Sequence, residues 1–433
     1  MPTACTCRPS ARLGRRGPAL GRLAAAALAA LLAAACAAAP TTERAAVAPP
    51  QPREALPLDE AVAVLAEQAF GEFQRGAGGV RRALVIDPLI DRATGQETDA
   101  TRSVAARLET LVRERYPALE VRPFAVAELD AQPLILLGAI TSVAAPASFT
   151  NAPGSSGTYR LWAVLGDLRT GLVLSHPNVW VRGESVDATP VRFFRDSPAW
   201  TADPMTAAYI RTCARNPGEP MDPVYLRGLR AQAAAAEATE AYEAGRYAAA
   251  LDLFRAAAEA PGGQQQRVLN GLYLTTWALG RLDAAEEAFA QLVDFGLAQD
   301  RLAVKLLFRA GTTEFVRDPG VSAPYPMWLR QIADRTDRRA ACLRVAGHSS
   351  ATGAPAANDR LSLARAERVR ARLVAERPTL RPRSRAEGRG SREVIVGTGT
   401  DDMRDALDRR VEFAPLPCGG LTAGAGAGQP AGG

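Results

Sequence analysis

Apolar residues between positions 58 and 185 follow two different periods. Helical spacing occurs twice, at Val62, Leu65, Ala69 and Phe73 and again at Val104, Leu108, Leu111 and Val112. Continuous apolar runs at 83–86 and 134–137 are typical of strands that are covered on both faces. Two further apolar runs, 159–165 and 172–181, flank a short polar segment and predict a hairpin. This alternation predicts an α/β domain over residues 58–185.

The next two segments differ in pattern. Residues 186–230 contain prolines and aromatic residues without a clean period, so they are expected to form an irregular linker. Residues 231–297 repeat: Gly245, Tyr247, Ala250, Phe254 and Ala257 are echoed 35 positions later by Gly280, Leu282, Ala285, Phe289 and Leu292. This spacing is close to the period of about 34 residues of tetratricopeptide repeats, and the segment resembles two such units. A plain helical spacer and a peptide-binding groove both remain open.

Residues 303–415 predict a further domain that mixes strands and helices. The expected order is strand, helix, strand, helix, strand, strand, at 306–310, 328–333, 342–347, 358–375, 394–397 and 410–414. The arginine-rich stretch 381–392 is interpreted as a solvated basic loop. Residues 416–433 are rich in Gly and Ala and are expected to be a disordered tail. The predicted fold class is multidomain, with an N-terminal α/β module, a short α-helical repeat module and a C-terminal α+β domain.

The N-terminus has the pattern of a secretory signal peptide, which would cover residues 1–35. Five arginines and no acidic residue precede an apolar run that is shorter than the roughly 20 residues needed to cross a bilayer. The run ends at Cys36, and residues 31–36 resemble the lipobox of bacterial lipoproteins, in which this cysteine is lipidated. Ala37 is not the aspartate that retains such proteins at the inner membrane, so the resemblance implies the outer membrane. Cleavage among residues 34–39 without lipidation would instead give a soluble periplasmic protein.

Composition restricts the classes of function. The formal charge of +6 includes the five N-terminal arginines, so their removal leaves +1, and a nucleic-acid partner is not expected. His176 and His348 are the only histidines, which argues against a histidine metal site and most histidine-based catalysis. No metal and no cofactor is expected. Residues 36–57, which are rich in Pro and Ala, are expected to form an extended tether.

Beyond the tether the chain carries three cysteines, Cys213, Cys342 and Cys418. In an oxidising compartment this odd number leaves one thiol without a partner in the chain. Cys342 and Cys418 each lie at the edge of a predicted strand in the same domain, and they are the pair that we favour. The sequence does not fix the connectivity.

The C-terminal domain resembles the OmpA-like peptidoglycan-associating domain. The matching residues are Gly347, His348, Ser349, Ser350, Asn358, Leu361, Ser362, Arg365, Ala366, Val369, Leu373 and the run 408–412. The order of elements in residues 58–185 resembles the periplasmic α/β domains of the FlgO, CsgG and TolB N-terminal type, which are binding and assembly modules. The C-terminal resemblance implies a ligand, the diaminopimelate of the peptidoglycan stem peptide, which bears both an ammonium and a carboxylate group.

The resemblance also implies which residues bind this ligand. Arg365 is the candidate for the carboxylate, because a planar guanidinium binds a carboxylate through two hydrogen bonds. Asn358 and Arg409 lie nearby in the family pattern, and Ser349 and Ser350 would add hydrogen-bonding groups. A solvent-facing arginine on an arginine-rich helix is the alternative interpretation of Arg365.

Ser350 stands where the family has an aspartate, so the acid for the ligand's ammonium is missing. Losing one member of a desolvated charge pair costs about 2–5 kcal/mol. Either another acid, Asp359, Asp401 or Asp402, takes this place, or the domain has drifted to a weaker or different ligand.

Two functions from different classes follow. The first is an outer-membrane lipoprotein, anchored through Cys36, that associates noncovalently with peptidoglycan and scaffolds an unknown envelope protein through its helical repeats. The second is a protein–protein adaptor whose OmpA-like domain has lost its affinity for peptidoglycan. The run 347–351 also mimics the nucleophile elbow of serine hydrolases, but Gly353 and Pro355 interrupt the helix that should follow, and no histidine lies downstream. An enzyme is therefore not expected.

Overall fold

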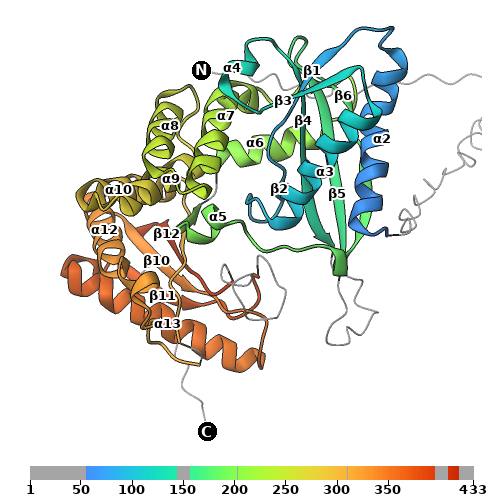
Figure 1. The fold of residues 1–433 in the computed structure, drawn as a ribbon. Helices are drawn as coiled ribbons and strands as arrows, with labels where there is room; N and C mark the ends of the chain where they lie inside the picture. Colours follow the sequence, from blue (N-terminus) through green and yellow to red (C-terminus); the bar gives the residue numbers. More distant parts are fainter. Residues whose placement is uncertain (1–54, 144–156, 202, 310, 395–407, 419–433) are drawn as a thin grey trace, which may run out of the picture. The chain divides into compact units, whose positions relative to one another are not determined.

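The computed structural model describes residues 55–143, 157–201, 203–309, 311–394 and 408–418 (Figure 1). The expected signal peptide, Cys36 and the tether up to residue 54 lie outside these ranges. Asp401, Asp402, the tail beyond Cys418 and most of the strand expected at 394–397 also lie outside them. Within the described ranges, no helix combines the length and the apolar character that a membrane span requires.

The first sheet has seven strands in the order β3-β1-β4-β5-β6, with β2 paired to β4 and β7 paired to β5. The strands are β1 (Arg82–Ile86), β2 (Ile90–Asp91), β3 (Leu119–Arg122), β4 (Leu134–Val143), β5 (Thr158–Asp167), β6 (Leu172–Ser175) and β7 (Asn178–Arg182). β1 pairs in parallel with β3 and β4, whereas β5 pairs antiparallel with β4, β6 and β7. The run expected at 172–181 is split into β6 and β7 at His176 and Pro177, since proline has no N–H to donate to the ladder.

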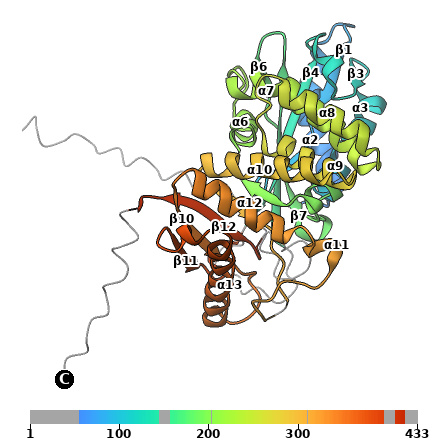
Figure 2. The same cartoon turned by 90° about the vertical axis from the view of Figure 1, so that its left-hand side faces the viewer.

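Helices cover both faces of this sheet (Figures 1 and 2). The helices are α2 (Leu58–Gly76), α3 (Asp99–Arg115), α4 (Val126–Leu129), α6 (Pro204–Cys213) and α7 (Pro223–Glu243). Successive residues of β1 point to opposite faces: Leu84 and Ile86 share a core with α2 and α3, whereas Val85 shares one with Tyr209 of α6 and Tyr225 of α7. Burial on both faces explains why the strands are apolar throughout.

Residues 186–230 are not an irregular linker. After a 3-10 turn at Gly183–Ser185, they form α5 (Arg192–Asp196), β8 (Ala199–Thr201), α6 and the first turns of α7. Two of these helices begin at Asp-Pro pairs, where the side chains of Asp203 and Asp222 accept hydrogen bonds from backbone N–H groups of the first turn. The short elements hide any periodicity, but these caps are a local signal that predicts helix starts.

Four helices form two consecutive hairpins. They are α7, α8 (Tyr247–Glu259), α9 (Gln266–Ala278) and α10 (Leu282–Ala298). Gly245 and Gly280 adopt positive φ between the helices of each hairpin, which explains their recurrence in the sequence. A Cβ placed on Gly271 would lie 2.3 Å from the ring of Phe254, so this glycine lets α8 and α9 approach closely. The first helix begins at residue 223, eight residues before the segment that the repeat pattern indicates.

The second sheet has five strands in the order β11-β10-β12-β9-β8. Its strands after β8 are β9 (Leu302–Val304), β10 (Cys342–Gly347), β11 (Ser384–Gly388) and β12 (Val411–Leu416). The accompanying helices are α11 (Pro319–Ser322), α12 (Tyr325–Arg338) and α13 (Pro355–Glu376), with a 3-10 turn at Pro378–Leu380. β11 runs parallel to β10, and the remaining neighbours are antiparallel.

Two strands of this sheet differ from the sequence prediction. The first strand of the segment is 302–304 rather than 306–310, and a strand occupies 384–388, within the stretch interpreted as a basic loop. β11 is an edge strand of sequence Ser-Arg-Ala-Glu-Gly, so its outer side needs no apolar residues and it leaves no hydrophobic pattern.

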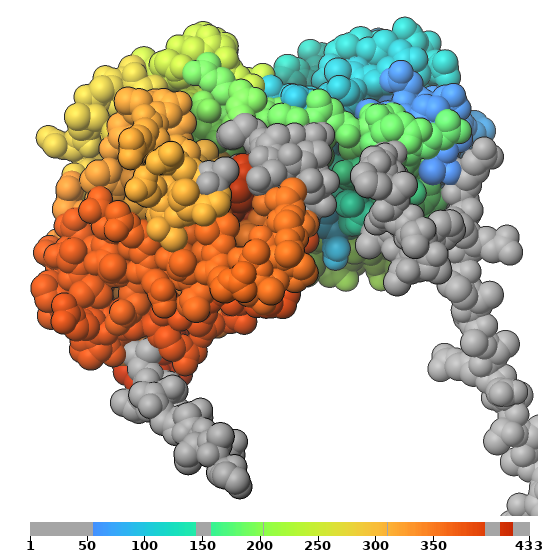
Figure 3. Space-filling view, turned by 90° about the horizontal axis from the view of Figure 1, so that it is seen from below, coloured from blue at the N-terminus to red at the C-terminus, as the bar shows by residue number. Residues whose placement is uncertain are grey.

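The second sheet is tied to the segments that precede it. β8 lies before the two helical hairpins in the chain but pairs with β9 after them, and the indole of Trp200 in β8 donates to Thr94 O at 2.7 Å. Arg330 of α12 forms an ion pair with Glu286 of α10 at 2.8 Å. The surfaces of the helical hairpins (yellow) and the C-terminal segment (orange) are accordingly continuous in Figure 3. Cys342 and Cys418, the pair favoured from the sequence, are joined by a disulfide, and Cys213 is a buried free thiol.

Candidate functional site

The turn after β10 is shaped by its contact with α13. A Cβ on Gly347 would lie 2.1 Å from the carbonyl oxygen of Ser362, so a glycine is needed where the strand passes the helix. The next two backbone N–H groups are fixed by other segments: His348 N donates to Arg410 O at 3.0 Å, and Ser349 N donates to Gly390 O at 2.9 Å. The turn 348–350 is therefore clamped between β12 and the loop after β11.

Asn358, in the first turn of α13, closes this turn from the other side. Its Nδ2 donates to Thr352 O at 2.9 Å and to Ser350 O at 3.4 Å, and the hydroxyl oxygens of Ser350 and Thr352 lie 3.2 Å apart. Asn358, Ser349 and Ser350 are all buried. The structure thus brings together three of the five residues that the sequence singled out for ligand binding.

Arg365 lies on the same helix, seven residues after Asn358. Seven residues are close to two helical turns, so both side chains share one face at a separation of about 10 Å along the axis. Arg365 is only 4% exposed; its Nε donates to Thr312 O at 3.2 Å, and its guanidinium carbon lies 4.8 Å from the ring centre of Phe308. It is therefore not a solvent-facing helix arginine. The loop that holds it is distant in sequence, so no pattern near Arg365 predicts these partners.

In the run 408–412, the buried arginine is Arg410 and not Arg409, the residue that the sequence pattern indicates for ligand binding. Arg409, the candidate ligand residue, is half-buried, whereas Arg410 is only 1% exposed. Arg410 Nε donates to Glu412 Oε1 at 2.7 Å, and Arg301 donates to the same oxygen at 2.6 Å. Burial would raise the pKa of Glu412, but the charges of Arg410 and Arg301 outweigh it and lower that pKa. Arg410 and Glu412 are thus a buried, ionised pair beside the turn.

Several polar atoms of the turn have no hydrogen-bond partner among the residues that the structure describes. These are both ring nitrogens of His348 and the hydroxyl of Ser349, which are buried, and the carboxylates of Glu393 and Glu412 lie 3.7 and 3.8 Å from the His348 ring. Burial, assisted by the positive charge of Arg410, lowers the pKa of His348 to about 3. The ring is therefore neutral at physiological pH and cannot act as an acid there. Buried polar atoms without partners mark a place where water or a ligand group can bind.

Of the three acids named as substitutes for the missing aspartate, the structure describes one. Asp359 forms an ion pair with Arg392, and Asp401 and Asp402 lie outside the described residues. Glu393, half-exposed at the rim of the turn, is a further acid, which the sequence analysis did not single out. In the described ranges, no group of three or more His, Cys, Asp and Glu side chains is arranged to hold a metal.

Comparison with known proteins places this site in a family context. The model of the OmpA family matches residues 327–407, which include most of α12 and all of β10, α13 and β11. None of the curated proteins matches the chain.

Three solved structures illustrate what the chain is similar to. The peptidoglycan-associated lipoprotein from Burkholderia pseudomallei is 20% identical, over 28% of this chain and 92% of that chain, with a TM-score of 0.23. The cell wall anchor of the T6SS from Pseudomonas aeruginosa is 27% identical, over 27% of this chain and 82% of that chain, with a TM-score of 0.23. An outer membrane protein from Borrelia burgdorferi B31 is 19% identical, over 27% and 88% of the two chains, with a TM-score of 0.21. From the family match at residues 327–407, the C-terminal part of this chain contains an OmpA-like domain.

Proposed function

We propose that this protein is a non-enzymatic cell-envelope lipoprotein that binds peptidoglycan noncovalently through its OmpA-like domain. The observation that carries the proposal is the family match at residues 327–407 together with the buried position of Arg365 on α13. A guanidinium held by a backbone carbonyl on one side and an aromatic ring on the other loses little conformational entropy when it binds a carboxylate. In this proposal Arg365 binds the carboxylate of diaminopimelate, and Asn358, Ser349, Ser350 and Arg409 surround it.

The absence of a charge at Ser350 determines how strongly the domain is expected to bind peptidoglycan. Without an acid at that position, the ammonium of the ligand must find Glu393 or remain hydrated, so binding is weaker than in a domain that has an aspartate there. The same observation supports the second candidate, an adaptor that keeps the fold but has no affinity for peptidoglycan.

The remaining parts of the proposal concern the rest of the chain. Cys36 is proposed as the lipidated residue that places the protein at the periplasmic face of the outer membrane, with the tether bridging to the folded part. The helical hairpins and the N-terminal α/β module are proposed as the surface for an envelope protein partner. Mass spectrometry of Cys36 in the protein extracted from membranes tests the anchor directly, because acyl chains add a defined mass to that residue.

Peptidoglycan binding is tested by co-sedimentation of the chain from residue 37 with purified, diaminopimelate-containing sacculi. The native protein should pellet and Arg365→Ala should remain in the supernatant. Arg368→Ala is the matched control, because Arg368 lies on the same helix and carries the same charge but is exposed. Pelleting of the Arg365→Ala protein at the native level contradicts the assigned site, and failure of the native protein to pellet favours the adaptor.

A further inference from the structure

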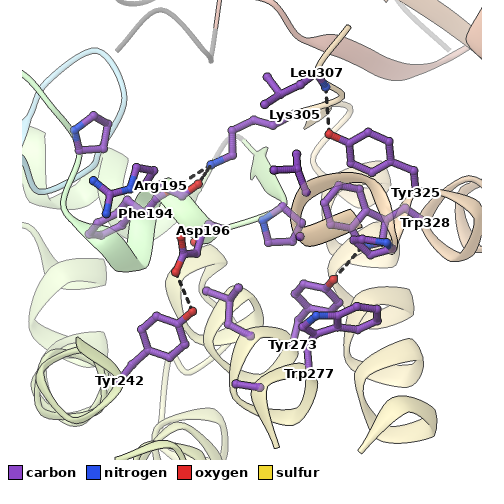
Figure 4. Close-up of a pocket in the computed structure, with 18 of the residues that line it drawn as sticks. Phe194, Arg195, Asp196, Tyr242, Tyr273, Trp277, Lys305, Leu307, Tyr325 and Trp328 are labelled. Carbon is purple, nitrogen blue, oxygen red and sulfur yellow. Dashed lines mark hydrogen bonds between the residues drawn. The ribbon is translucent and has the colours of Figure 1, made fainter. Parts of the chain in front are cut away.

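A cavity of about 410 Å³ lies between the helical repeats and the segments that lead into the OmpA-like domain (Figure 4). Its walls come from the loop between β2 and α3, from α5, from α7 and α9 of the helical hairpins, from the stretch after β9, and from α11 and α12. Phe194, Trp277 and Trp328 give these walls large aromatic surfaces. None of the residues assigned to peptidoglycan binding lines the cavity, so it is a separate feature.

Two tyrosine hydroxyls in the cavity wall have unused protons. The Tyr273 hydroxyl accepts a hydrogen bond from Trp328 Nε1 at 3.0 Å, and the Tyr325 hydroxyl accepts one from Leu307 N at 3.1 Å (Figure 4). In the described part of the chain, neither hydroxyl donates a hydrogen bond in turn. A hydroxyl carries one proton as well as two lone pairs, so both groups can donate to a ligand.

The third donor is Lys305, the only lysine of the chain. Its Nζ donates to Phe194 O at 2.8 Å and to Arg195 O at 3.0 Å. An ammonium has three protons, so one remains for a ligand. Burial lowers the pKa of Lys305 from 10.5 to about 7, against the opposing charge of Asp196. An anion next to this amine would favour its charged form.

A buried acceptor completes the set of polar groups. Gln96 lines the same cavity and is only 2% exposed, yet its Oε1 has no hydrogen-bond partner within the described ranges of the chain. A buried carbonyl without a donor is costly, which makes Gln96 an independent sign that a group is missing from this site.

We propose that this cavity binds a small carboxylate with an aromatic or aliphatic body. The carboxylate faces Lys305, further ligand oxygens accept from Tyr273 and Tyr325, and an N–H or O–H of the ligand donates to Gln96. The body of the ligand packs against Trp277 and Trp328. A cavity of this size suits a molecule of amino-acid dimensions.

The test uses N-acetyl-L-phenylalanine and its neutral analogue N-acetyl-L-phenylalaninamide as probes, with the chain from residue 37. The two probes have nearly the same shape and differ in the carboxylate. Isothermal titration and the fluorescence of the cavity tryptophans both report binding. We expect the acid to bind with a Kd below about 1 mM and at least tenfold more tightly than the amide. A hexapeptide that ends in free phenylalanine distinguishes a peptide terminus from a free small acid as the source of the carboxylate.

Lys305→Met removes the amine and keeps a side chain of similar length. This variant should bind the acid and the amide equally, and its binding of the amide shows that the cavity is intact. The acid should also protect native Lys305, the only lysine, from trinitrobenzenesulfonate, measured on the Lys305 peptide because the reagent modifies the N-terminal amine as well. Equal binding of both probes by the native protein, a preference for the acid that survives Lys305→Met, or no binding of either probe up to about 10 mM overturns the proposal. These outcomes are independent of co-sedimentation with peptidoglycan.

Discussion

Removal of the Cys342–Cys418 disulfide is expected to destabilise the OmpA-like domain by several kcal/mol. The bond joins the first residue of β10 to a residue just beyond β12, with a sequence separation of 76. The closed loop contains α13 and β11, which make up much of the domain. In the chain-entropy treatment, a loop of this length lowers the entropy of the unfolded chain by about 15 cal/mol/K, equivalent to about 4.5 kcal/mol at 25 °C.

The assay compares the double variant Cys342→Ser, Cys418→Ser with Cys213→Ala, which removes a buried thiol and no cross-link. Unfolding in guanidinium chloride, with amide hydrogen exchange of β10 and β12 followed by mass spectrometry, gives the free energy of unfolding of this domain. We expect the double variant to lose about 3–4.5 kcal/mol relative to the native chain. A loss below about 1 kcal/mol would refute the reasoning. So would three titratable thiols in the unfolded, non-reduced chain from residue 37.

Three further predictions follow from single residues. Ser350→Asp restores an acid beside the turn and should strengthen co-sedimentation with sacculi at least tenfold, whereas unchanged pelleting would show that the ammonium is bound elsewhere. The pKa of Lys305 is about 7 in the folded chain and 10.5 in the unfolded chain, so between these values the unfolded chain binds more protons and the free energy of unfolding rises with pH. Lys305→Met should flatten this rise in urea titrations at pH 7 to 10. An unchanged slope of unfolding free energy against pH contradicts the pKa shift. Gly347→Ala places a Cβ against the Ser362 carbonyl and should lower the melting temperature, whereas Gly76→Ala, where a Cβ meets nothing within 4 Å, should lower it less; the reverse order contradicts the close approach.

The long, strongly patterned elements could be predicted from the sequence, and the short ones could not. Strands buried on both faces, such as β1 and β4, leave apolar runs, and α13 matches the helix expected at 358–375 closely. β8 and β11 have three and five residues and lie at the edges of their sheet, where few apolar side chains are needed. That β8 pairs with a strand about a hundred residues later is a tertiary fact without a local signature.

The candidate site follows the same division. The spacing of Asn358 and Arg365 places them on one helix face, which the sequence predicts from helical periodicity alone. The partners of Arg365, Thr312 and Phe308, come from a loop more than fifty residues away, so their contact depends on the folded domain. The cavity around Lys305 is even harder to predict from the sequence, because its walls come from segments that are not adjacent in the chain.

The central claim is that the OmpA-like domain binds a diaminopimelate carboxylate through Arg365. The most direct measurement is isothermal titration of the chain from residue 37 with two soluble muropeptides that differ only in that carboxylate, one free and one amidated. The account predicts that the native protein binds the free acid at least tenfold more tightly, that Arg365→Ala loses this preference, and that Arg368→Ala keeps it. Equal affinity of the native protein for both muropeptides, or a preference that persists in Arg365→Ala, would contradict the account.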